Sequence, residues 1–342
     1  MTHSAALIEI ERLIRRDPAR RGLIATEDSR GPLCPGHLGE AAIDLAERGK
    51  FVVIVTGFYI PGAVPPAAET DGPPGAVMLA SALIRCGMSV QIATDEFCRR
   101  ALEVALREMQ LPESLVTVPG STASEIDRWF QETSALHREW SHLIAIERVG
   151  PSHHRRSIQQ QQLELAFSHS AADLAEFERL VPESEQDHCY NMRGVCLDDV
   201  TPPLHRLFEL ARDSQRIKTI GIGDGGNEIG MGSIGWNELR QRLNHAAAAR
   251  IPCRIPTDWT IVAGVSNWGG MALAAATLLL RDEAASLQSW TTEQQRHLLE
   301  RLVIEGPAVD GITRLPEPTV DGLPFLTYIQ PWEGIRRVAG LD

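Results

Sequence analysis

Hydrophobic positions along the chain predict short buried strands that alternate with helices. The clearest strand is FVVIVT at 51–56, because a short continuous run of β-branched and apolar residues is typical of strands covered on both faces. Similar apolar runs recur, separated by segments with apolar residues at helical spacing. The expected strands are 51–56, 89–93, 114–118, 142–146, 217–222 and 259–263. The expected helices include 37–48, 73–85, 124–136, 230–243 and 292–305. This alternation predicts a doubly wound α/β fold with a mainly parallel sheet and helices on both faces.

One region breaks the alternation. Residues 151–188 contain two adjacent histidines, a glutamine run at 159–162 and then one more helical pattern. Such a departure from a regular α/β pattern is typical of an insertion. We therefore expect one domain over residues 1–342, with an inserted or smaller helical region near 151–205.

The stretch GIGDGGNEIGMG at 221–232 is the strongest candidate for a functional loop. It follows an apolar strand and precedes a helical pattern, and such loops build sites at the carboxyl ends of strands. Its glycines let the backbone approach a ligand closely, and its reactive side chains are those of Asp224, Asn227 and Glu228. The loop lacks the Lys of a phosphate-binding P-loop and is not a clean dinucleotide fingerprint. The alternative interpretation is a tight turn with a solvated acid.

Two further strand exits carry polar residues. A long loop rich in proline and glycine follows the strand at 51–56 and contains Glu69 and Asp71. Loops of this length in compact domains are usually functional, although Asp71 or Thr70 could instead cap the helix at 73–85. Glu147 and Arg148 leave the strand at 142–146, where they either face a ligand or pair with each other.

Two more positions complete the candidate set. Asn267 follows the strand at 259–263 within a second strand, glycine loop and helix unit, where Ser266 or Asn267 could also be an ordinary N-cap. Arg193 stands beside a glycine and could hold a carboxylate bidentately, the alternative being a surface charge.

Charge and cysteine usage narrow the functional classes. The net charge is −12, from 33 basic and 45 acidic residues, which argues against nucleic acid or an anionic membrane as partners. The six cysteines include no pair with zinc-ligand spacing and no redox C-x-x-C motif, so we expect reduced thiols in a cytoplasmic protein. The sequence has neither a signal-peptide core nor an apolar run long enough to span a bilayer.

Several sequence blocks together resemble one family. They are ETDGPPGA at 69–76, AIERVG at 145–150, the glycine loop, AGVSNWGG at 263–270 and VDGLPF at 320–325. In order and wording they resemble the C-terminal domain of D-glutamate cyclase and its stand-alone bacterial relatives. The resemblance implies an α/β fold and dehydration of D-glutamate to 5-oxo-D-proline by a hydro-lyase. The animal enzyme carries an additional N-terminal lyase-like domain, so if catalysis needs that domain, this protein either has another activity or needs a separate lyase-domain chain as a partner. We also consider a homo-oligomer.

Closing a lactam from glutamate requires a proton acceptor for the amine, an activated γ-carboxyl group and a proton donor for the leaving oxygen. The predicted catalytic residues are Asp224, Glu228 and Glu147. The predicted substrate-binding residues are Arg148, Arg193, Asn227, Asn267, Asp71, Gly225 and Gly226. Mg²⁺ could take over the electrophilic role, with hard oxygen ligands from Glu69, Asp71, Asp224 and Glu228.

Two other functional classes compete with this hypothesis. One is an Mg²⁺-dependent enzyme that handles phosphates or nucleotides, and the other is a non-catalytic domain that binds a small molecule. In every case we expect a small-molecule ligand, and we expect the candidate residues at the strand exits to converge in one cleft.

Overall fold

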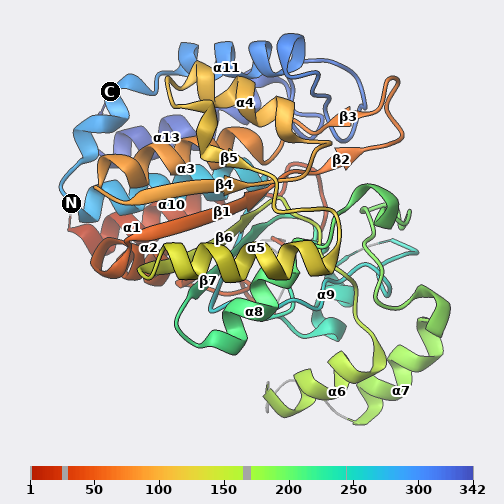
Figure 1. Cartoon of the computed structure of the whole chain (residues 1–342). Coiled ribbons are helices and arrows are strands. Elements are labelled where there is room, and N and C mark those ends of the chain that lie inside the picture. The colour runs from red at the N-terminus through yellow and green to blue at the C-terminus, as the bar shows by residue number, and fades with distance from the viewer. Residues whose placement is uncertain (1, 25–29, 165–170, 244, 342) are drawn as a thin grey trace.

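The computed structural model describes residues 2–24, 30–164, 171–243 and 245–341 (Figure 1). Its centre is a parallel sheet of six strands in the order β5-β4-β1-β6-β7-β8. The strands are β1 Phe51–Thr56, β4 Ser89–Ala93, β5 Val116–Thr117, β6 Trp140–Ile146, β7 Lys218–Gly223 and β8 Trp259–Val262. The predicted doubly wound parallel sheet is therefore confirmed. A small hairpin of β2 Tyr59–Ile60 and β3 Ala67–Ala68 follows β1.

The strand order places a switch point at the centre of the sheet. The chain runs outward from β1 through β4 to β5, and then returns to β6 on the other side of β1. Loops that leave two such neighbouring strands diverge and leave a crevice at their carboxyl ends. Thr56 pairs with Ile146, and Ile146 pairs with Ile222, so β1, β6 and β7 end near one level. Residues that follow these strands therefore meet at one edge of the sheet.

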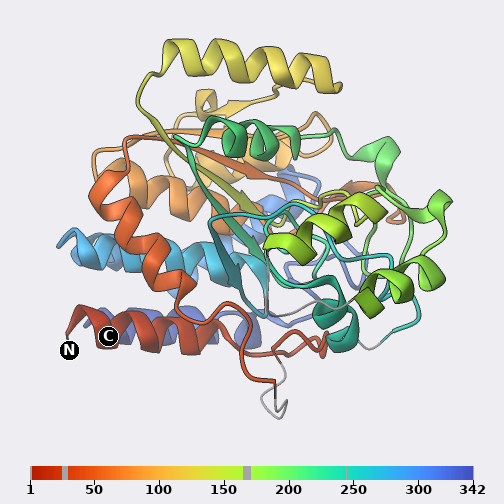
Figure 2. The same cartoon turned by 90° about the horizontal axis from the view of Figure 1, so that it is seen from below.

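Helices cover both faces of the sheet (Figure 2). One layer contains α2 His37–Arg48, α3 Pro73–Arg85 and α10 Ser266–Leu280, and the other contains α5 Ala123–Leu136 and α8 Arg206–Ser214. The central strand β1 serves both cores, because Val52 and Ile54 join the first core while Val53 and Val55 join the second. A strand buried on both faces must be apolar throughout, which explains its continuous apolar run.

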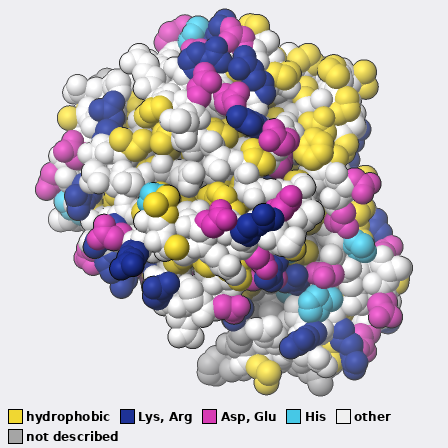
Figure 3. All heavy atoms as spheres, viewed as in Figure 1, with side chains coloured by type: hydrophobic (Ala, Val, Ile, Leu, Met, Phe, Trp, Pro, Cys, Tyr) yellow, Lys and Arg dark blue, Asp and Glu magenta, His cyan; other side chains and the backbone are white. Residues whose placement is uncertain are grey.

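Further helices complete the body of the protein. Helix α1 packs against α10 and α13, and α11 packs against α4. Their bounds are α1 His3–Ile14, α4 Arg99–Glu108, α9 Trp236–Arg242, α11 Thr292–Glu305, α12 Phe325–Tyr328 and α13 Gln330–Val338. Among the described residues, every helix is too short or too polar to span a lipid bilayer. Figure 3 shows basic and acidic side chains intermingled over the viewed face.

The region that interrupts the α/β pattern forms two helices that project from the body (Figure 1). They are α6 Arg155–Glu164 and α7 Ala171–Leu180, and the glutamine run lies within α6. Phe177 meets the ring of Trp236 edge-on with centroids 5.2 Å apart. Ile158 and Val181 join these two rings in a separate small apolar cluster, which anchors the helices to α9.

The predicted helix at 230–243 is wrong in its first half, since α9 begins only at Trp236. Residues before α9 instead fold back, and the N–H of Gly230 donates to the Ile255 carbonyl at 2.9 Å. A Cβ atom added to Gly221 would lie 2.5 Å from the Cα of Gly230, so the loop lies directly on β7. This close approach of two backbones requires glycine on both sides.

Candidate active site

A cleft of about 180 Å³ opens where β1, β6 and β7 end. It is smaller than the roughly 300–1,000 Å³ of pockets for drug-sized ligands, so it suits a small metabolite. The predicted site residues that line it are Glu69, Glu147, Arg193, Asp224, Asn227 and Glu228. Those that do not line it are Asp71, Arg148, Gly225, Gly226 and Asn267. The expected convergence at the strand exits thus brings together side chains from four of the predicted segments.

Buried carboxyl groups crowd the inner end of the cleft. They belong to Glu69, Asp71, Glu147, Asp224, Glu228 and Asp321. Asp224 lies at the centre, because it has an oxygen within 4.8 Å of oxygens of Asp71 and Asp321 and, in a second group, of Glu147 and Glu228. Charged forms are disfavoured here both by the loss of water and by like-charge repulsion.

These surroundings shift the protonation equilibria. Burial raises the pKa of Glu147 well above its ordinary value, and the nearby Asp224 and Glu228 raise it further. Burial and Asp321 similarly raise the pKa of Glu69 and of Asp71. Burial raises the pKa of Asp321 to about 7, against the opposing influence of Arg21. Much of the cluster therefore holds protons near neutral pH.

Arg21 supplies the cation of this cluster, although no motif in the sequence pointed to it. Its guanidinium forms ion pairs with Asp224 and, at 2.6 Å, with Asp321. Asp17 accepts the N–H of Arg21 at 2.8 Å and thereby fixes the turn that presents it. Burial raises the pKa of Asp224 to about 6 while Arg21 opposes the shift. Asp224 thus titrates close to neutral pH.

Glu228 is held by the backbone of its own loop. Its Oε1 accepts the N–H groups of Asp224 at 3.1 Å and Gly225 at 2.6 Å. Its Oε2 accepts the N–H of Gly226 at 2.8 Å. The glycine N–H groups predicted to bind substrate therefore point to this carboxylate instead. Three N–H donors replace the water that Glu228 loses on burial.

Glu147 is presented by an unusual backbone conformation. Its φ is +45°, in the left-handed region that non-glycine residues rarely occupy, and such strain clusters at functional sites. Its Oε2 accepts the hydroxyl proton of Ser266 at 2.5 Å. The following residues pair with the glycine loop, since the N–H of Ile229 donates to the Arg148 carbonyl at 2.9 Å. This pairing holds Glu147 beside Asp224 and Glu228.

Asp71 caps the N-terminus of α10, and Asn267 caps the N-terminus of α3. Asp71 accepts the N–H groups of Ser266 at 2.9 Å and Asn267 at 2.7 Å, at the start of α10. Asn267 Oδ1 accepts the N–H groups of Gly72 at 3.0 Å and Gly75 at 2.8 Å, at the start of α3. The local caps considered as the alternative interpretation are therefore not formed, because each helix receives its cap from beside the other helix. The exchange directs both positive helix N-termini toward the acid cluster.

The two predicted carboxylate-binding arginines lie in different surroundings. Arg148 is buried, where it forms an ion pair with Asp95 and donates to the carbonyls of Gly57 at 2.9 Å and Pro202 at 2.8 Å. It ties the end of β6 to the loop after β1. Arg193 lies at the rim of the cleft and donates to the Ile312 carbonyl at 3.0 Å. Arg314 also lines this rim, although no motif in the sequence pointed to it.

The carboxylates predicted to bind Mg²⁺ do not form one set, because Asp71 and Glu228 belong to two different groups and Glu69 belongs to neither. Asp224 belongs to both groups, whereas Asp71 and Glu228 already accept backbone N–H groups. Arg21 forms ion pairs with Asp224 and Asp321, where a divalent cation would compete with it. Either group offers the hard oxygen donors that Mg²⁺ prefers, and Asp224 is common to both.

Replacing Asn267 with Ala tests the cap exchange. The change removes the acceptor for two buried N–H groups, so we expect the free energy of unfolding to fall by about 2–4 kcal/mol. Chemical denaturation measures this loss. The control Thr291→Ala removes one ordinary exposed cap, at the start of α11, and should cost about 1 kcal/mol or less. Equal losses in the two variants would contradict the special role of Asn267.

Comparison with known proteins agrees with the family resemblance of the sequence blocks at 69–76, 145–150, 221–232, 263–270 and 320–325. Residues 10–166 and 173–331 match the family described as D-glutamate cyclase-like, C-terminal. The chain is also 28% identical over 350 residues to the human protein named D-glutamate cyclase, mitochondrial. That match covers 94% of this chain and 50% of the human protein, so the chain spans half the length of this relative. The protein therefore belongs to the D-glutamate cyclase-like C-terminal family.

Proposed function

We propose that this protein is a carbon–oxygen lyase that dehydrates D-glutamate, or a related amino acid, to 5-oxo-D-proline. The observation that carries the proposal is the charge gradient along one cleft. Asp224 and Glu147 lie at its buried inner end, while Arg193 and Arg314 line its rim. Among the described residues, neither rim arginine forms an ion pair with an acid. An amino dicarboxylate matches this gradient, with its ammonium group inside and a carboxylate at the rim.

The family and the human relative's name support the same reaction, and the two central acids suit its proton transfers. With its pKa near 6, Asp224 is largely ionised at neutral pH and can accept a proton from the amine. Glu147, with its raised pKa, retains a proton that it can donate to the γ-carboxyl oxygen. Two carboxyl groups in one site thus receive opposite roles from their surroundings.

The bond changes balance within the substrate. The nitrogen attacks the γ-carbon, a C–N bond forms, a C–O bond breaks and water leaves. Two protons leave the nitrogen and two reach the departing oxygen, so Asp224 and Glu147 transfer protons without a net change. Arg21 lies beside Asp224, and its positive charge favours the negative charge that develops on the γ-carboxyl oxygens.

Two substitutions separate a catalytic carboxylate from a structural one. Asp224→Asn removes the proton acceptor, so turnover of D-glutamate to 5-oxoproline should fall by about a hundredfold or more. Glu228→Gln leaves one acceptor oxygen for three N–H donors, so it should lower the melting temperature more than it lowers the rate per folded molecule. Product formation and thermal unfolding are measured on the same samples.

Two further measurements decide between the candidate functions. L-glutamate reports the stereochemical preference, and nucleotides with Mg²⁺ in a thermal-shift screen test the phosphate-handling alternative. Full activity in Asp224→Asn would remove this residue from the mechanism. Absence of 5-oxoproline with the unmodified protein, both with and without added Mg²⁺, would refute the proposed function.

The dependence of the rate on pH tests the roles proposed for Asp224 and Glu147. The rate should fall as pH decreases through about 6, because protonated Asp224 cannot accept the amine proton. It should also fall at higher pH, when Glu147 loses its proton. Ser266→Ala removes a donor to ionised Glu147 and should move this alkaline limb to higher pH. A pH profile of kcat/KM for the unmodified protein and for Ser266→Ala checks the direction of each change. An alkaline limb that does not move in Ser266→Ala would argue against Glu147 as the acid.

Substitutions of the rim arginines test how the substrate carboxylate is held. Arg314→Ala should raise KM about 10-fold or more with little change in kcat, because a charge-assisted hydrogen bond contributes about 1.5–3 kcal/mol. Arg193→Ala should behave alike if both arginines hold the substrate carboxylate. Arg12→Ala, which removes an exposed cation paired with Glu9 on α1, is the control and should leave both constants unchanged.

A further inference from the structure

A short hairpin at 189–197 forms one wall of the cleft. The N–H of Leu197 donates to the Cys189 carbonyl at 2.7 Å, and the N–H of Asn191 donates to the Val195 carbonyl at 3.0 Å. Between them, Tyr190 pairs with Cys196 in an antiparallel bridge. The tip contributes Asn191, Met192, Arg193 and Val195 to the cleft lining. The position of this hairpin therefore determines the shape of the rim.

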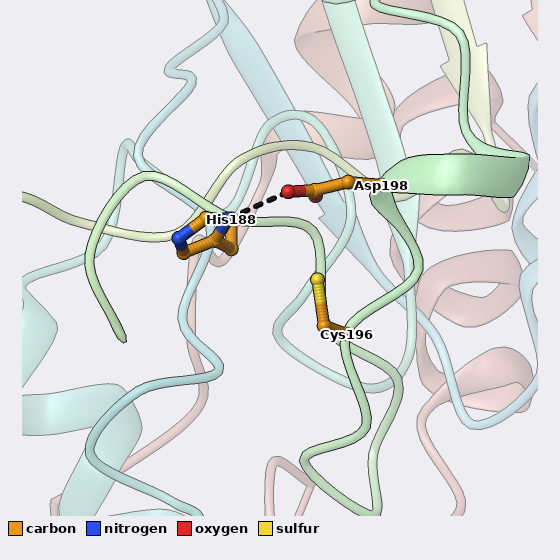
Figure 4. Close-up of side chains that lie close together, drawn as sticks. All are labelled: His188, Cys196 and Asp198. Carbon is orange, nitrogen blue, oxygen red and sulfur yellow. Dashed lines mark hydrogen bonds and ion pairs between the residues drawn. The ribbon is translucent and has the colours of Figure 1, made fainter. Parts of the chain in front are cut away.

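The base of the hairpin brings together three side chains of different chemistry (Figure 4). One ligating atom each of His188, Cys196 and Asp198 lies within 4.8 Å of the other two. The Nδ1 atom of His188 is 2.6 Å from Asp198 Oδ2, and Figure 4 shows these two groups pointing toward each other with the Cys196 sulfur nearby. Cys196 and Asp198 are exposed, so an ion from solvent can reach them.

The cluster is already partly ordered. Asp198 Oδ1 accepts the N–H of Cys189 at 2.8 Å, which leaves Oδ2 directed at His188. The backbone pairing within the hairpin fixes Cys196 opposite Tyr190, on the strand that leads to Asp198. Two of the three candidate ligands thus approach from one side of the hairpin base and His188 from the other.

Imidazole nitrogen, thiolate sulfur and carboxylate oxygen form a donor set typical of Zn²⁺ and similar transition ions, whereas Mg²⁺ and Ca²⁺ prefer oxygen alone. Zn²⁺ bonds of about 2.0–2.3 Å in a tetrahedron place donor atoms about 3.5 Å apart. Side-chain movements of about 1 Å would therefore admit an ion. Three protein ligands leave the fourth position to water.

We propose that His188, Cys196 and Asp198 bind a Zn²⁺-like transition-metal ion that locks the base of the hairpin. The ion joins the two ends of the hairpin, which otherwise meet through backbone hydrogen bonds and the pair between His188 and Asp198. It would act as a structural or regulatory ion, separate from the acid cluster at the inner end of the cleft.

The hairpin also connects this site to the glycine loop. Asn227 Nδ2 donates to the Tyr190 carbonyl at 2.8 Å, and Arg250 donates to the Gly194 carbonyl at 3.1 Å. An ion at the base would therefore steady both the rim residue Arg193 and the loop that carries Asp224. This effect on the cleft rests on the proposed function, whereas the binding of the ion does not.

The test titrates the full-length protein with Co²⁺ and Zn²⁺ in the presence of a phosphine reductant and without substrate. Co²⁺ bound to a thiolate gives a charge-transfer absorption band, and Zn²⁺ should displace it. We expect one equivalent with the unmodified protein. Cys196→Ser should abolish the band, and His188→Gln should weaken Zn²⁺ binding by about tenfold or more. Cys34→Ser, which changes a free cysteine of the loop before α2, should retain full binding.

Thermal unfolding supplies a second readout. Zn²⁺ should raise the melting temperature of the unmodified protein and of Cys34→Ser but not that of Cys196→Ser, because only a folded protein with the site gains binding free energy. Equal melting temperatures without metal show that the variants fold. A Co²⁺ thiolate band that persists in Cys196→Ser, or its absence from the unmodified protein, would overturn the proposal. Because no substrate is used, these outcomes are independent of the cyclase activity.

Discussion

Burial of many acids beside one cation is the constraint on which the site depends. Asp224 and Asp321 share the guanidinium of Arg21, while Glu69, Asp71 and Glu147 have raised pKa values. A cluster of this kind cannot ionise fully, because every added charge is desolvated and repelled by its neighbours. Glu69, Asp71 and Glu147 therefore retain protons near neutral pH. A carboxyl group that keeps its proton at neutral pH is also what the proposed dehydration needs as a proton donor.

The carboxylates of the cluster divide into two kinds according to their partners. Glu228 and Asp71 accept backbone N–H groups, from the glycine loop and from the start of α10 respectively. Such bonds hold a carboxylate in place and make it part of the scaffold. Asp224 and Glu147 instead face side chains, Arg21 and Ser266, so their charge can change without loss of backbone bonds. In the proposed reaction, the proton transfers are therefore assigned to this second pair.

Much of this arrangement could be predicted from local sequence. The apolar run at 51–56 identifies a doubly buried strand, and parallel topology then brings Glu147 and Asp224 to one edge. Arg21 could not be found in this way, because it meets Asp224 and Asp321 only through the tertiary fold. The exchanged caps were missed for the same reason, since capping rules consider neighbours along the chain. The candidate ion site escaped cysteine-spacing rules because its three ligands are different residue types arranged across a hairpin.

The two sides of the cleft differ in how firmly they are held. The inner side rests on paired strand ends and on the caps that Asp71 and Asn267 exchange, both of which belong to the buried core. The rim rests on a short hairpin whose polar contacts lie near the surface, and solvent competes with such contacts. Asn227 links the two sides, because its side chain reaches the hairpin while its backbone belongs to the glycine loop. A regulatory contact that controls substrate entry without disturbing the acid cluster would therefore act most directly on the hairpin at 189–197.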